Sequence, residues 1–357
     1  MNIAIIGAGA SGLMLSSILT KNNIKHTIFN KGKIGRKILA SGNGKCNISN
    51  INLKSEYYHD SEFYYIVKDY QSKLFEIFKS LDIYTYSDNE GRLYPKSNSS
   101  ESILNILLKH ATKNIVDIEV KSIKKVNNKY YINDYNEAFD KVVISTGTNA
   151  NFKKNTVPSI AFLNDLKIKI KPFKPSLSGF KTSINLKDIS GVRVKALTKL
   201  YNKNELIHEE SGEVMFKDEG ISGIVIMNQS SYFNHIKNYD KPYIMLDMLY
   251  NEDYDNLESI FQPKLYKYIL KNNINIHKFI IPIKDYYDME FAQVATGGIE
   301  YKYMRENLSL KSDKNIFVTG EVLDIDGVCG GYNLMFAFTS AIKVGEELIN
   351  EVSNKWF

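Results

Sequence analysis

Cysteine is scarce in this chain, with Cys46 and Cys329 as the two copies among 357 residues. Two thiols so far apart imply no disulfide framework, so we expect a protein of a reducing compartment, the cytoplasm. No apolar run reaches the roughly 18 residues that a membrane-spanning helix needs, so we expect no membrane partner. The apolar stretch at residues 3–6 has no basic lead and runs into glycines, which predicts no signal peptide.

Histidine clusters and charge asymmetry are also lacking. The six histidines are scattered, and none pairs at metal-ligand spacing, so we expect no metal. The 46 basic and 40 acidic residues leave a net charge of +6 without a concentrated basic face. We therefore expect no nucleic-acid partner, and a small positive excess suits an anionic phosphate cofactor.

The positions of the glycines in the first thirty residues predict a strand, then a turn, then a helix. Asn2–Ile6 is a short apolar run typical of a buried parallel strand, and Ala10–Lys21 is helix-like. Between them lies G-x-G-x-x-G, which in this context predicts a dinucleotide site, because its glycines permit the turn, pyrophosphate approach and close helix packing. The helix N-terminus then faces the phosphates. The candidate residues here are Gly7, Gly9, Ala10, Ser11 and Gly12.

Asn30 follows the second predicted strand, "KHTIF", at a position that usually carries Asp or Glu. Its amide oxygen can accept a hydrogen bond from a ribose hydroxyl, but without charge, so we expect a weaker contact. We include its neighbour Lys31 among the candidate cofactor-binding residues.

The C-terminal segment "NIFVTGEVLDIDGVCGGYNLMF" favours FAD over a nicotinamide dinucleotide. A strand over 316–319 leads into an acid-rich, glycine-rich loop and then a long helix from about Tyr332 to Asn350. The acid after the strand can bond ribityl hydroxyls, and the helix N-terminus can face the flavin N1–C2=O edge, where negative charge collects on reduction. Another predicted strand, 141–145, ends beneath the dinucleotide. The candidates are Thr146, Gly147, Gly320, Glu321, Asp326, Gly330, Gly331, Tyr332 and Asn333.

Five motifs extend this interpretation along the chain: GRKILASGNGKCN, GRLYPKSN, GEVMFKDEGISG, ATGGI and GEVLDIDGVCGGYNLMFAF. In content and order they resemble the BaiN-like bacterial flavoproteins, also catalogued as an aminoacetone-oxidase-type FAD-binding family of NAD(P)/FAD-dependent oxidoreductases. The resemblance implies that residues 35–47 wrap the flavin and its phosphates. It places Arg36 and Lys37 near the diphosphate and Val120 at the adenine, and it implies further cofactor contacts from Ser41, Gly42, Gly44, Cys46 and Asn47.

Two positions depart from the family pattern. Asn43 stands where the family usually has Gly, and Lys45 stands where it has Arg. Asn tolerates positive φ better than most residues, so we expect the turn to survive. Lysine keeps the charge but lacks the planar guanidinium fork, so it cannot make a bidentate contact.

The expected fold is α/β. The resemblance implies a Rossmann-like FAD-binding domain of the two-dinucleotide-binding-fold flavoprotein type, without a second nicotinamide-binding domain. That domain is expected over 1–165 and 286–357. An inserted substrate domain is expected over 166–285, β-rich over 166–250 and helical over 251–285. Within the insert, 192–216 predicts strands separated by turns, and 256–273 predicts a helix interrupted at Pro263.

We expect an FAD-dependent oxidoreductase that acts on a small organic substrate. The resemblance suggests reduction of an activated C=C bond, with NAD(P)H docking transiently as the reductant. Three alternatives stay open: an amine or hydroxy-compound oxidase or dehydrogenase, an RNA-modifying flavoprotein, and a non-enzymatic flavin redox sensor. No catalytic residue can be named, because a flavin carries its own redox chemistry. Cys46 and Cys329 could both approach the flavin as a redox-active dithiol, but they lie far apart in sequence, so we expect buried, inert thiols.

Overall fold

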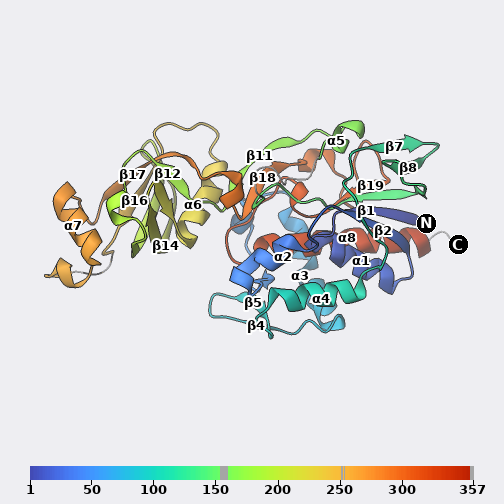
Figure 1. Cartoon of the computed structure of the whole chain (residues 1–357), viewed down its shortest axis with the longest axis horizontal. Coiled ribbons are helices and arrows are strands. Elements are labelled where there is room, and N and C mark those ends of the chain that lie inside the picture. The colour runs from blue at the N-terminus through green and yellow to red at the C-terminus, as the bar shows by residue number, and fades with distance from the viewer. Residues whose placement is uncertain (153–159, 251, 253, 354–357) are drawn as a thin grey trace. The chain divides into compact units, whose positions relative to one another are not determined.

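The structure is a computed structural model that describes residues 1–152, 160–250, 252 and 254–353 (Figure 1). The described chain forms two compact units. Unit one comprises residues 1–149, 160–173 and 297–353, and unit two comprises residues 150–152, 174–250, 252 and 254–296. The chain passes between the units in β11 (Lys171–Ser176) and β18 (Val294–Gly298), which pair with each other.

Unit one is built on a five-stranded parallel sheet with the order β19-β10-β1-β2-β6. Numbered along the sheet-forming strands, this is the 5-4-1-2-3 order of a Rossmann fold, so the strand order reverses between β1 and β10. The strands are β1 (Asn2–Ile6), β2 (Lys25–Asn30), β6 (Ile115–Asp117), β10 (Lys141–Ile144) and β19 (Ile316–Val318).

Helices pack on one side of this sheet, where α1 contacts both α4 and α8, and α3 also contacts α8 (Figure 1). On the other side lies the antiparallel β7-β8-β9 sheet, which connects β6 to β10. A second small sheet has the order β3-β5-β4. The elements are α1 (Ala10–Lys21), α2 (Arg36–Ala40), β3 (Ser49–Asn50), α3 (Tyr64–Ser80), β4 (Thr85–Ser87), β5 (Arg92–Pro95), α4 (Ser100–His110), β7 (Ile123–Val126), β8 (Lys129–Ile132), β9 (Ala138–Phe139), α5 (Phe162–Asp165) and α8 (Tyr332–Ser353).

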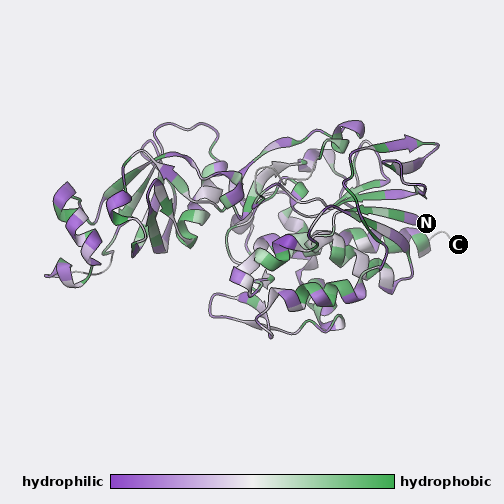
Figure 2. Ribbon diagram, viewed as in Figure 1, coloured by the Kyte–Doolittle hydropathy of each residue, from purple (hydrophilic) through white to green (hydrophobic). Residues whose placement is uncertain are grey.

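Unit two is a closed antiparallel barrel with the order β12-β15-β14-β13-β16-β17. Side chains alternate between the barrel core and the surface, as the hydropathy bands of the barrel strands show (Figure 2). The core includes Ala196, Leu200 and Phe216, all fully buried. The elements are β12 (Phe180–Thr182), β13 (Arg193–Asn202), β14 (Glu205–Lys217), β15 (Gly220–Ser222), α6 (Ile224–Asn234), β16 (Tyr243–Asp247), α7 (Pro263–Asn272) and β17 (Phe279–Tyr286).

The structure confirms the α/β class and the first β-α-β segment, and it differs from the expected insert in three respects. The units change at 173/174 and 296/297, where the sequence placed the change at 165/166 and 285/286. The expected helical part, 251–285, contains the barrel strand β17. Pro263 begins α7 and does not interrupt it, because the first position of a helix needs no N–H donor. Residues 153–159, 251, 253 and 354–357 of the expected domains lie outside the described residues.

Among the described helices, none combines the length and the apolar character that crossing a bilayer requires.

Candidate functional site

The candidate site lies in unit one, at the edge of the parallel sheet where its strands end. Because the five strands run in the same direction, the loops that follow them meet at this edge, and ligands of such folds bind where the strand order reverses. Here that point lies between Gly7, which follows β1, and Thr146-Gly147, which follow β10. The predicted segments after β1, β2, β6, β10 and β19 are therefore brought to one edge.

The glycine loop after β1 leaves space over one of its three glycines. A Cβ on Gly7 would lie 2.5 Å from the Ser145 carbonyl oxygen, and one on Gly12 would overlap the Gly7 carbonyl oxygen. A Cβ on Gly9 would meet none of the described atoms within 4 Å. Gly9 is also the N-cap of α1, and none of the described side chains caps this helix end. The loop therefore combines open space with the positive end of a helix dipole, a combination that favours a bound anion.

Asn30 has a role in the loop that the sequence did not reveal. Its side-chain oxygen accepts a hydrogen bond from the Ala8 N–H over 2.9 Å, and its amide nitrogen donates to the Gly32 carbonyl oxygen over 2.9 Å. Asn30 thereby ties the end of β2 to the glycine loop. Its partners were missed because the expected acid at this position suggested only a sugar contact.

The segment that follows β2 folds back onto the same loop. The Gly35 N–H donates to the Ala8 carbonyl oxygen over 2.9 Å, and α2 begins directly after it. The short turn Ser41–Gly44 then contains three consecutive residues at positive φ, namely Gly42 at 55°, Asn43 at 51° and Gly44 at 87°. Asn43 thus adopts the left-handed conformation that we expected it to tolerate. Three such residues explain why this turn is rich in glycine and asparagine.

Cys46 is fully buried at the end of this turn, with φ at 62°. The Ser41 hydroxyl donates to its sulfur over 3.3 Å. Burial raises the pKa of the Cys46 thiol to about 11, although the hydrogen bond from Ser41 opposes the shift. Such a thiol is a poor nucleophile at neutral pH, as an inert structural cysteine should be. Cys329 is partly exposed, in contrast to its expected burial.

Lys37 reaches across the sheet edge to the loop after β19. Its ammonium nitrogen lies 2.5 Å from Glu321 Oε2 and 2.8 Å from the Thr148 hydroxyl. The Lys37 and Glu321 side chains are 22% and 13% exposed. Burial lowers the pKa of the neighbouring Arg36 guanidinium, and the Glu321 carboxylate opposes that shift. The Arg36 and Lys37 cations and the Glu321 carboxylate therefore lie close together at this edge of the sheet.

The turn containing Cys46 is continuous with residues that contact the C-terminal glycines. The Asn50 amide donates to the Gly330 carbonyl oxygen over 3.0 Å. With the Asn47 amide oriented to satisfy its neighbours, its oxygen accepts from the Gly331 N–H over 3.1 Å. Asn333 closes the loop before α8 through two 2.8 Å hydrogen bonds with the backbone of Gly327. Two predicted segments far apart in sequence are thus joined by hydrogen bonds.

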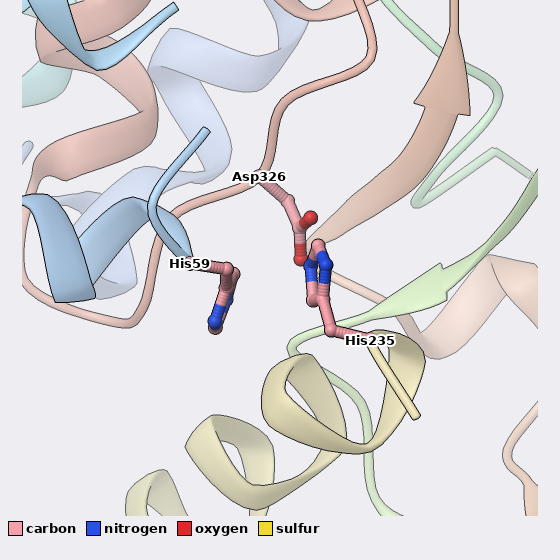
Figure 3. Close-up of side chains that lie close together, drawn as sticks. All are labelled: His59, His235 and Asp326. Atoms are coloured by element: carbon pink, nitrogen blue, oxygen red, sulfur yellow. The ribbon is translucent and has the colours of Figure 1, made fainter. Parts of the chain in front are cut away.

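Asp326 is 2% exposed in the loop before α8 (Figure 3). The turn that ends at His59 packs on this loop, since the Val328 N–H donates to the Tyr57 carbonyl oxygen over 3.0 Å. The side-chain atoms of His59 and Asp326 that could bind a metal ion lie within 4.8 Å of each other. Sequence reasoning missed this neighbourhood because no motif links two such distant positions.

Val120 lies after β6, and it is 5% exposed. The preceding Asp117 carboxylate accepts a hydrogen bond from the Gly32 N–H over 3.4 Å, which links the ends of β6 and β2. The predicted adenine contact thus belongs to the same sheet edge as the glycine loop. Another candidate, Tyr332, is the first residue of α8, and its backbone oxygen accepts from the Tyr58 hydroxyl over 2.8 Å.

Comparison with known proteins gives a family and several distant relatives. The family profile described as the HI0933-like protein Rossmann domain matches residues 1–347. The 3-dehydro-bile acid delta(4,6)-reductase of Clostridium scindens is 26% identical, over 96% of this chain and 98% of that protein. The ribosomal RNA dihydrouridine synthase of Haemophilus influenzae is 24% identical, over 94% of this chain and 96% of that protein.

A solved structure shares the fold. It is the 3-ketosteroid delta1-dehydrogenase of Sterolibacterium denitrificans in complex with 1,4-androstadiene-3,17-dione. The two chains superimpose with a TM-score of 0.53 at 8% identity, and the match covers 98% of this chain and 99% of that one. At this level of identity the likeness concerns the fold alone.

Proposed function

The chain belongs to the HI0933-like Rossmann-domain family, and from this premise we propose that it is an FAD-dependent oxidoreductase that reduces a C=C bond conjugated to a carbonyl group in a small organic substrate. NAD(P)H is the proposed electron donor. The observation that carries the proposal is the open space over Gly9 at the reversal of strand order, next to the uncapped N-terminus of α1.

The residues at this edge of the sheet suit the separate parts of the FAD molecule. The diphosphate fits over Gly9, where a side chain is absent and backbone N–H groups of α1 begin. The Glu321 carboxylate suits the ribityl hydroxyls, since an ionised carboxylate offers about four acceptor sites. The N-terminus of α8, preceded by Gly330 and Gly331, suits the flavin edge that gains negative charge. Val120 at the end of β6 suits the adenine.

Bound FAD would supply the hydride chemistry, and the protein would supply binding, orientation and charge. The Asn30 and Gly35 contacts with Ala8 hold the phosphate-binding loop in shape. Burial of Cys46 and its high pKa keep a competing nucleophile away from the reaction. NAD(P)H is proposed to dock transiently, because the described residues contain a single five-stranded parallel sheet, and FAD fits there.

The names of two relatives support the substrate class. One relative is named a delta(4,6)-reductase of 3-dehydro-bile acids, and this name places two double bonds, at carbons 4 and 6, in conjugation with the 3-carbonyl. The other is named for dihydrouridine, which is uridine with its ring double bond, conjugated to a carbonyl, reduced. The chemistry that these names share is reduction of a conjugated C=C bond, and this is the activity that we propose for the chain.

The relative from Haemophilus influenzae, which is named for dihydrouridine, favours a second candidate function, the reduction of uridine in ribosomal RNA. The two candidates differ in the size and charge of the substrate. RNA binding would weaken steeply as salt is raised, because bound lysines release counterions from the phosphates. Reduction of a neutral cyclic enone would depend much less on salt.

Anaerobic oxidation of NADH or NADPH tests these candidates. The purified FAD-loaded protein is mixed with 4-androstene-3,17-dione as a cyclic enone, or with an unmodified ribosomal RNA fragment. Enone-dependent oxidation with a saturated product supports the first candidate, and dihydrouridine in the RNA supports the second. Turnover of neither substrate, together with oxygen consumption on amines, would contradict both and favour an oxidase. FAD binding without turnover of any donor and acceptor pair would instead indicate a redox sensor.

A further inference from the structure

Lys37, Thr148 and Glu321 come from three distant parts of the chain and meet at one point. Lys37 lies in the first turn of α2, Thr148 follows β10, and Glu321 lies in the turn after β19. One ammonium group bonds both partners, at 2.8 Å and 2.5 Å. The resemblance implied that Lys37 lies near the diphosphate, whereas the observed contacts direct its ammonium group to a carboxylate and a hydroxyl.

We propose that Lys37 is a positioning residue that fixes the Glu321 carboxylate for the ribityl hydroxyls of FAD. This inference rests on the proposed flavoprotein function. It assigns different tasks to two adjacent residues of α2. Lys37 acts through Glu321, and Arg36 supplies the net positive charge of this group of three side chains.

Burial explains why Glu321 needs this partner. Its side chain is 13% exposed, and a carboxylate removed from water is costly unless a charge and hydrogen bonds compensate it. Lys37 donates to one oxygen, Oε2, and its second hydrogen bond, to the Thr148 hydroxyl, restricts where the ammonium group can lie. A carboxylate held in this way still has acceptor sites for hydroxyl donors. Without Lys37, Glu321 would turn toward water or toward Arg36.

Gly147 reinforces the geometry. It adopts a positive φ of 64°, and a Cβ at this position would lie 3.9 Å from Glu321 Oε2. The loop after β10 therefore passes directly beside the carboxylate. The Thr148 hydroxyl, on a residue that is 5% exposed, connects this loop to Lys37. The ends of β10 and β19 are thus linked through one lysine side chain.

FAD affinity, measured by quenching of flavin fluorescence, tests the proposal in Lys37→Met, Glu321→Gln and the double variant. We expect either single substitution to raise the FAD dissociation constant roughly 10- to 100-fold, as for a lost hydrogen bond to a charged group. The double variant should bind no more weakly than the weaker single variant, because both changes remove one interaction. Lys37→Arg should retain most of the affinity, and Lys33→Met, at an exposed lysine of the same segment, should retain all of it.

ADP, which has the diphosphate but no flavin or ribityl chain, separates positioning from direct phosphate binding. We expect Lys37→Met to leave the ADP dissociation constant within about twofold of the wild-type value, since ADP lacks the ribityl hydroxyls that we propose for Glu321. Equal losses of ADP and FAD affinity, or additive losses in the double variant, would overturn the inference and make Lys37 a phosphate ligand. Thermal melting of the FAD-free variants checks that each is folded.

The inference and the proposed function fail in different ways. If the wild type binds FAD and the Lys37→Met variant binds it equally tightly, the inference alone is overturned. A folded wild-type protein that takes up no FAD would overturn the proposed function and the inference with it.

Discussion

The side-chain oxygen of Asn30 accepts a hydrogen bond from the backbone N–H of Ala8 over 2.9 Å. This contact joins the end of β2 to the glycine loop after β1, and Asn30 also holds the following turn by donating to the Gly32 carbonyl oxygen. An uncharged amide can make both bonds at once, because it carries a donor and an acceptor. An aspartate would keep the first bond but place a carboxylate oxygen against a carbonyl oxygen.

Asn30→Ala should weaken FAD binding without unfolding the protein. It removes the acceptor of the Ala8 N–H, and a lost hydrogen bond of this kind costs about 1 kcal/mol, or roughly fivefold in affinity. The control is Asn22→Ala, which removes a comparable side-chain bond to the Ile18 carbonyl oxygen at the exposed end of α1. Titration of FAD into both variants measures the effect, and equal affinities for the two would contradict it.

Alanine at Gly9 and at Gly12 should have opposite effects on stability. Gly9 has φ at −86°, and a Cβ there meets none of the described atoms within 4 Å, so Gly9→Ala should fold at least as well as the wild type. It should nevertheless lose most FAD binding, because the methyl group would occupy the space of the pyrophosphate. Gly12→Ala should instead lower the melting temperature, because its Cβ would overlap the Gly7 carbonyl oxygen.

Melting curves of the FAD-free proteins and FAD titrations separate these two effects. A Gly9→Ala protein that binds FAD like the wild type would place the dinucleotide elsewhere. A Gly12→Ala protein with unchanged stability would show that α1 can shift to admit the methyl group.

Local segments of the fold were predictable because a few neighbouring residues determine them. Asn2–Ile6 and Ala10–Lys21 have the predicted bounds, and the strands at 141 and 316 begin at the predicted residues and end one residue earlier than predicted. The closure of the barrel was not predictable, because β12 pairs with both β15 and β17, which lie far away in the chain. A strand pattern reports which residues alternate, and it does not report their distant partners.

The residues of the candidate site also fall into those whose contacts could be predicted from the sequence and those whose contacts could not. The glycine loop could be predicted because its spacing carries its own physical meaning. The Lys37 contact with Glu321 could not, because a flexible lysine side chain can reach many partners and only the fold decides among them. Asn30 lies between these cases, since its position at the strand end was predictable and its bond to Ala8 was not.

Stability should fall as pH drops below about 6.5, and His26 should be one cause. The His26 ring lies 2.7 Å from the Ile24 carbonyl oxygen and 2.7 Å from the Ser16 hydroxyl, which in turn accepts from the Thr112 N–H. Burial lowers the pKa of His26, while the bond to Ile24 opposes the shift. The unfolded chain therefore binds the proton more readily, so acid favours unfolding.

Urea unfolding between pH 5 and pH 8 measures this contribution. His26→Gln should flatten the pH dependence of the free energy of unfolding below about pH 6.5. A pH dependence that is unchanged in His26→Gln would assign the acid sensitivity to other groups.

Cys46 should resist thiol reagents in the folded protein. It is fully buried, and the pKa of its thiol is raised to about 11, so little thiolate exists at pH 8. In a Cys329→Ser background, we expect 5,5′-dithiobis(2-nitrobenzoic acid) to label one thiol only after denaturant is added. Labelling within seconds under native conditions would contradict the assignment of Cys46 as an inert structural cysteine.

The visible absorption spectrum of the purified protein, followed by anaerobic addition of NADH or NADPH, tests the central claim most directly. We predict a yellow protein that releases FAD on denaturation and is bleached by one of the two nicotinamides. A folded, colourless protein that takes up no added FAD would contradict the claim, and the open space over Gly9 would then belong to another anionic ligand.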